Sequence, residues 1–146
     1  MRKLCMSMLL VLVPVASAAP PPPTPGDGEY RAPEPEVYII EPRDGATVSN
    51  PVRVVFGLRH MGVAPAGVNH LNTGHHHLVI DQELPRLDQP IAAGYRNVRH
   101  FNGGQTETQI ILLPGTHTLQ LLIGDYAHMP HIPAIASEKI TVTVKP

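Results

Sequence analysis

The sequence predicts an all-β protein, an immunoglobulin-like two-sheet antiparallel sandwich of about seven strands. Its 146 residues include 17 prolines and 12 glycines, which favour turns over helices. Short segments alternate apolar and polar side chains with the period of two that is typical of half-buried strands. The connections between them are too rich in proline and glycine for the crossover helices of a βαβ fold.

Seven segments carry the strand pattern, and turn residues separate them. In 116–123, one face has His117, Leu119, Leu121 and Ile123, and the other has Thr118 and Gln120. The predicted strands are residues 37–40, 52–58, 75–81, 98–101, 105–113, 116–123 and 138–144. We expect them to form one sandwich domain over residues 37–146, because this length suits a single core.

Residues 1–18 have the three parts of a secretory signal peptide. Arg2 and Lys3 give a positive start, residues 4–15 are mostly apolar, and the small residues 16–18 form a cleavage site. The apolar run is shorter than the roughly 20 residues that span a bilayer. We therefore expect export to the periplasm or the medium, with no membrane span after cleavage. The single cysteine, Cys5, would leave with the signal, which excludes disulfides from the mature protein.

Residues 19–36 are dominated by proline and offer almost nothing to bury, so they predict a disordered spacer. The full chain has 11 basic and 12 acidic side chains, and loss of Arg2 and Lys3 would leave nine basic side chains against twelve acidic ones. This acidic balance argues against a nucleic-acid partner.

Few residues of the mature chain suit nucleophilic or acid–base catalysis. Its only serines, Ser49 and Ser137, lie outside a Gly-x-Ser-x-Gly elbow, and the sequence has no phosphate loop or dinucleotide motif. No spacing singles out a pair of carboxylates. The nine histidines are therefore the strongest candidates for chemistry.

Two groups of histidines predict a transition-metal site. In the strand 75–81, the period of two places His75 and His77 on one face and His76 on the other. Two further histidines lie three residues apart in a proline-stiffened loop after the strand 116–123. The expected ligands are His75, His77, His128 and His131, with His100 and Asp125 in reserve.

Imidazole suits both copper and zinc, and the thioethers of Met61 and Met129 would add soft donors for Cu(I). Copper is therefore favoured over zinc, and the site would make the protein a metal carrier or accessory protein. An enzyme would need the same histidines around a metal with an open position, with Glu107 as a base.

Two other hypotheses stay open. In the first, the histidines form a structural hydrogen-bond network and bind no metal. Residues 102–107 can either orient the histidines through hydrogen bonds or form a plain hairpin turn. His117 is expected to be a core histidine bonded to a backbone group, and His60 and His70 are expected to be solvated. Alternatively, the domain is a non-metal module of the cell envelope that binds a polysaccharide, peptidoglycan or a protein.

Five stretches of the chain are long and specific: FGLRHMGVAPAGV at 56–68, NTGHHHLVID at 72–81, LDQPI at 87–91, HFNGGQTET at 100–108 and PGTHTLQLLIGDYAHMPH at 114–131. They resemble, in this order, the bacterial exported family called domain of unknown function 4399. The resemblance covers most of residues 52–144 and implies export, a compact single domain and histidine stretches that are the family's own motifs. It implies no activity. His60 stands where we expect a small residue after FGLR, which leaves it outside the expected site.

Overall fold

Strands make up all the regular structure of residues 32–94 and 97–146, the part of the chain that the computed structural model describes. The predicted signal peptide and most of the predicted spacer lie outside these residues. The strands are β1 (Glu36–Glu41), β2 (Thr47–Val48), β3 (Val52–Arg59), β4 (Gly62–Val63), β5 (Thr73–Ile80), β6 (Val98–His100), β7 (Glu107–Ile110), β8 (Gly115–Gly124) and β9 (Ile140–Val144).

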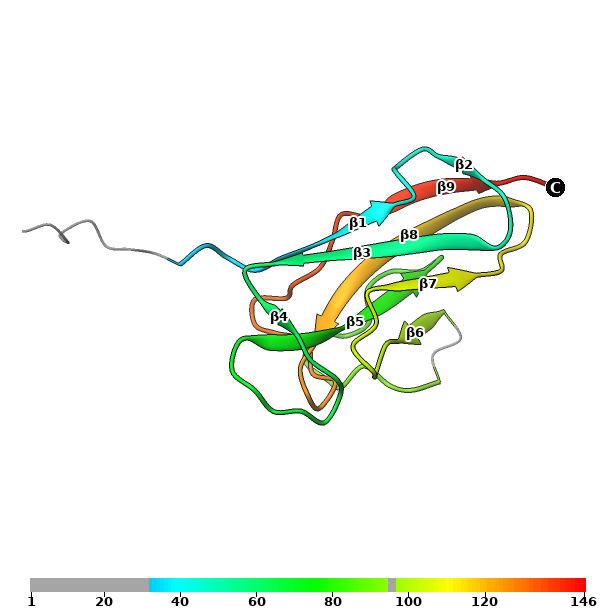
Figure 1. Ribbon diagram of the computed structural model, residues 1–146. Helices are drawn as coiled ribbons and strands as arrows, with labels where there is room; N and C mark the ends of the chain where they lie inside the picture. The colour runs from blue at the N-terminus through cyan, green and yellow to red at the C-terminus, as the bar shows by residue number, and fades with distance from the viewer. Residues whose placement is uncertain (1–31, 95–96) are drawn as a thin grey trace, which may run out of the picture. The chain divides into compact units, whose positions relative to one another are not determined.

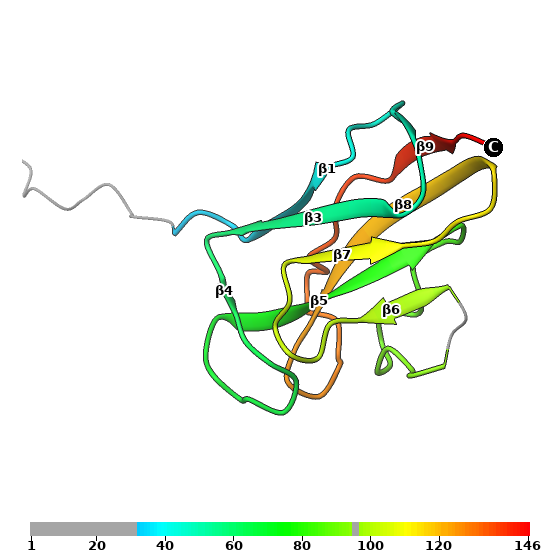
Figure 2. The same ribbon diagram turned by 45° about the vertical axis from the view of Figure 1, so that its right-hand side comes forward.

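These strands form two sheets, which Figures 1 and 2 show as two layers. One sheet has the order β1-β3-β7, and the other has the order β2-β9-β8-β5-β4, with β6 paired to β5 as well. The prediction of an all-β two-sheet sandwich is confirmed.

The main core lies between the two sheets, because strands of both sheets turn alternate apolar residues inward. Val37, Val54 and Ile110 of the three-stranded sheet pack in one cluster with Leu121 and Val142 of the six-stranded sheet, and each is at most 3% exposed. Burying side chains of this size contributes about 1.5–3 kcal/mol each. This core fixes the strands that carry the histidines.

The sandwich is not purely antiparallel, which corrects the prediction in one respect. β2 pairs in parallel with β9, and β4 pairs in parallel with β5. Each of these added strands has two residues, too few for a sequence alternation to show. β4 lies between the predicted strands 52–58 and 75–81, and Gly62 N donates to Asn72 O at 3.0 Å beside it.

A second, smaller apolar cluster lies on the opposite face of the six-stranded sheet. Val79 of β5 and Leu122 of β8 pack there with Val98 of β6 and with Ile91, which is 2% exposed. The segment between β5 and β6 and the segment after β8 supply the cover. This face of β5 is therefore buried under loops, and the histidine site lies in that layer.

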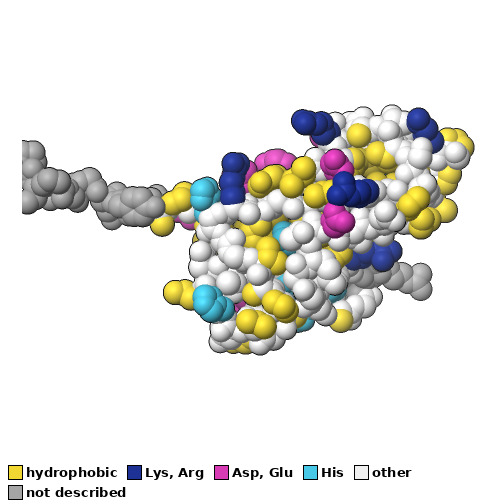
Figure 3. All heavy atoms as spheres, viewed as in Figure 1, with side chains coloured by type: hydrophobic (Ala, Val, Ile, Leu, Met, Phe, Trp, Pro, Cys, Tyr) yellow, Lys and Arg dark blue, Asp and Glu magenta, His cyan; other side chains and the backbone are white. Residues whose placement is uncertain are grey.

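The outer face of the three-stranded sheet has charged side chains beside exposed apolar ones, since Tyr38 and Ile40 of β1 are 37% and 47% exposed. Arg53 of β3 bridges Glu41 and Glu107 on the neighbouring strands, and Figure 3 shows basic and acidic side chains side by side on this surface. Residues 32–94 and 97–146 contain no helix long and apolar enough to cross a membrane.

Candidate metal centre

Three consecutive histidines of β5 point to alternate sides of the sheet, as the period of two predicts. His75, His76 and His77 are all 0% exposed. The ring of His76 lies 5.1 Å from the ring of Phe56, a residue of the main core. The rings of His75 and His77 lie 4.6 Å apart on the loop-covered side. Two imidazoles of one strand therefore meet in a buried layer.

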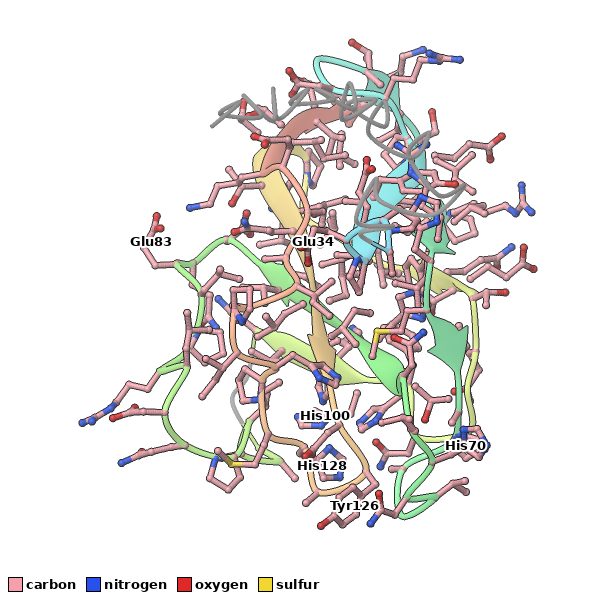
Figure 4. All side chains as sticks on the ribbon, turned by 90° about the vertical axis from the view of Figure 1, so that its left-hand side faces the viewer. Glu34, His70, Glu83, His100, Tyr126 and His128 are labelled. Atoms are coloured by element: carbon pink, nitrogen blue, oxygen red, sulfur yellow. The ribbon has the colours of Figure 1, made fainter. Side chains whose placement is uncertain are left out.

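The loop after β8 brings a third imidazole to this pair. His128 Nδ1 lies 3.0 Å from His75 Nε2 and 3.4 Å from His77 Nε2. Figure 4 shows His128 at the loop end of the sandwich, close to His100. These three residues each offer a ring nitrogen, and the three nitrogens lie within 4.8 Å of one another.

The loop places His128 through its own hydrogen bonds. Asp125 N donates to Met129 O at 2.8 Å, and Asp125 Oδ1 accepts from Ala127 N and Met129 N at 2.8 and 2.9 Å. The turn closes with His128 in the left-handed region at φ 64°. A histidine has a small conformational cost there, which the surrounding bonds offset.

The distances between these nitrogens suit a metal ion. Metal–imidazole bonds are about 2.0–2.1 Å long, so two nitrogens on one tetrahedral ion lie roughly 3.3 Å apart. The separations of 3.0 and 3.4 Å bracket that value. Two of the three separations therefore suit a shared metal ion, and all three nitrogens lie within 4.8 Å of one another.

Burial keeps the strand imidazoles neutral, which is the form that binds metals. Burial, and then repulsion by the neighbouring imidazoles, lowers the pKa of His75 to about 4 and that of His77 to about 3. The Nδ1 atoms of both rings are buried without a hydrogen-bond partner among the described residues. A neutral imidazole has one nitrogen lone pair, so at neutral pH each ring can offer one to a metal.

Gly124 makes the room that this packing needs. It is paired with His75 across β8 and β5. A Cβ at this position would lie 2.7 Å from His77 Cε1 and 3.4 Å from His128 Cα. Sequence reasoning did not single out this residue, although a glycine closing an otherwise apolar core strand is a signal of close approach.

His100, a predicted reserve ligand, borders the group. β6 places it directly opposite His77 on β5, and their rings are 4.5 Å apart. Its ring is 5.2 Å from that of His128, and its Nε2 donates to Ala92 O at 3.2 Å.

The other two predicted ligands lie outside the group of three. Asp125 uses Oδ1 to hold the turn that carries His128. His131 is half-buried, and its Nε2 lies 3.1 Å from where a Cβ of Gly74 would be. That nitrogen is buried without a hydrogen-bond partner among the described residues, and burial lowers the pKa of the ring.

The remaining histidines have structural or solvated positions. His60 and His70 are exposed, as expected. His117 binds a backbone group, as expected, since it donates to Leu113 O at 2.8 Å; its side chain is 14% exposed and also donates to Asp81 Oδ2 at 2.7 Å. The backbone bond expected for His117 is confirmed, but the ring lies at the edge of the core, near the start of β8 and beside the carboxylate of Asp81.

The stretch 102–107 forms a turn, but the expected hairpin is wrong, because β6 pairs with β5 in one sheet and β7 pairs with β3 in the other. Gly104 N donates to Phe101 O at 3.0 Å, and Gly103 N donates to Gln105 Oε1 at 3.0 Å. Glu107, considered as a base, instead accepts from Arg53 at 2.6 Å on the outer surface.

Fold and site together define an all-β sandwich with a buried histidine cluster that can hold a metal ion. The model of the family described as a domain of unknown function (DUF4399) matches residues 54–145, and the chain belongs to this family. The resemblance drawn from the sequence motifs is thereby confirmed. No curated protein and no solved structure matches the chain.

Proposed function

We propose that this protein binds one transition-metal ion, copper before zinc, through His75, His77 and His128, and acts as an exported carrier or accessory protein. The observation that carries the proposal is the convergence of three imidazole nitrogens, 3.0 and 3.4 Å apart across the β5–loop contact, in a buried layer. The proposal of export rests on the signal-like residues 1–18.

The chemistry of the donors supports copper or zinc over the hard cations. All three donors are neutral nitrogens, whereas Mg²⁺ and Ca²⁺ prefer oxygen. Divalent copper generally binds such sites more tightly than zinc, which favours copper as the ion bound. The competing hypothesis is a structural network, in which His128 exchanges hydrogen bonds with the two strand histidines.

Titration of the metal-free protein with Cu(II), Cu(I) and Zn(II) separates these hypotheses. We expect one ion per chain. Free metal at about 100 times Kd adds about 2.7 kcal/mol to the free energy of unfolding and raises Tm on the order of 10 °C. His128→Ala should weaken binding more than about 100-fold, because loss of an outer-shell partner alone costs 10–100-fold.

His70→Ala is the matched control, because His70 is an exposed histidine of the same chain. It should bind metal as the wild type does. Binding that is equally weak in wild type and His128→Ala, with a lower Tm for the variant alone, would show that the histidines are structural.

A further inference from the structure

His100 is held firmly beside the three nitrogens. Its backbone lies opposite His77 in the β5–β6 pairing, and Phe101 N, the next residue, donates to His76 O at 3.1 Å. Its ring packs edge-on against that of His77, with the centroids 4.5 Å apart. The ring therefore has little freedom to move toward or away from the cluster.

The carbonyl of Ala92 sets the tautomer of this ring. A carbonyl oxygen only accepts, so the contact of 3.2 Å requires that His100 Nε2 carries the proton. In the neutral ring Nδ1 then has a free lone pair. That atom is buried and has no hydrogen-bond partner among the residues that the structure describes. A buried acceptor in this state needs a donor.

His100 lies beside the group of candidate ligands but is not a member of it. Two atoms that bind the same ion at about 2.1 Å can be separated by no more than about 4.2 Å. The nitrogens within 4.8 Å of one another belong to His75, His77 and His128, and His100 is not part of that group. A ring next to the ligand group but outside it can accept a hydrogen bond from a fourth ligand of the metal.

We propose that the three-histidine site keeps an open fourth position, filled by water, and that His100 Nδ1 accepts a hydrogen bond from this water. This inference rests on the proposed function, since it requires the metal. Its consequence is that the site takes small exogenous ligands, such as anions, in exchange for water. Because the water at the fourth position exchanges, a ligand of another protein can bind the ion there and take it over.

The test uses the purified protein loaded with Co(II), whose visible spectrum reports ligand exchange, and azide as the probe. Azide should displace water and change the spectrum of the wild type. Because azide cannot donate a hydrogen bond to His100, His100→Ala should bind azide about 2- to 10-fold more tightly than the wild type. His70→Ala should bind azide as the wild type does.

X-ray absorption of the zinc form supplies a second readout that does not require a variant. We expect three imidazoles and one oxygen around the ion. Four imidazoles, no response to azide, or equal azide affinity in wild type and His100→Ala would each overturn the role of His100 while leaving metal binding intact. Failure to bind any metal would overturn the proposed function, and this inference with it.

Discussion

At the scale of single residues, the site depends on small and neutral groups in close contact. Burial keeps His75 and His77 uncharged, so that three imidazoles can meet without the repulsion that three cations would suffer. Gly124 leaves the space in which the ring of His77 lies. A side chain at this position would compete with that ring for the same volume.

Gly124→Ala should therefore weaken metal binding about 10-fold or more and lower the free energy of unfolding by about 1–3 kcal/mol, the usual range for overpacking. Zinc titration and urea unfolding measure both effects. Gly62→Ala on β4 is the control, because its added Cβ would meet only Thr73 Cγ2 at 3.2 Å and Asn72 O at 3.7 Å. Unchanged zinc affinity in Gly124→Ala would show that the ring of His77 does not need its observed position.

At the scale of strands and loops, alternation predicted which strand histidines share a face, because a strand has a fixed period. Spacing did not predict which loop histidine joins them. His128 reaches the strand pair only because Asp125 closes its turn and because His128 adopts φ 64°. After this turn, Pro130 pairs with Gly124 in an antiparallel bridge. The next residue, His131, therefore lies beside Gly74 and not beside the strand histidines. Side-chain bonds of this kind leave no periodic signal in the sequence.

The junction of β5 and β8 contains a separate pH-dependent contact. His117 faces two acceptors, Asp81 Oδ2 and Leu113 O, so both ring nitrogens must donate and the ring is an imidazolium. The hydrogen bond with Asp81 raises the pKa of His117, although burial opposes it. A base whose pKa is higher in the folded state than in the unfolded state stabilises the folded protein. This contribution is complete below the unfolded pKa, near 6.5, and is lost as the pH rises through the folded pKa.

His117→Gln should thus cost stability below pH 6.5, by about 1 kcal/mol, and cost less at pH 9. Urea unfolding at both pH values measures the difference in free energy of unfolding between wild type and variant. The buried histidines are present in both proteins, so their contributions cancel in this difference. An equal cost at both pH values would contradict an imidazolium at this position.

At the scale of the whole molecule, the sandwich acts as a rigid frame and its loops supply the cover of the site. Gly67 N donates to Tyr126 O at 2.9 Å, and Ile91 N donates to His128 O at 2.9 Å, so two distant segments are tied to the loop that carries His128. Figures 1 and 2 show the segments before β5 and after β8 gathered at one end of the sheets. Composition and alternation were enough to predict the sandwich. The cover could not be predicted, because it depends on contacts between residues far apart in the chain.

The central claim is that one metal ion lies between His75, His77 and His128. Crystals of the protein grown with zinc or copper, measured at the absorption edge of that metal, test it most directly. We predict one strong anomalous peak per chain, about 2.0–2.1 Å from a ring nitrogen of each of the three histidines. No peak between these rings, or peaks only at exposed histidines such as His60 and His70, would contradict the claim.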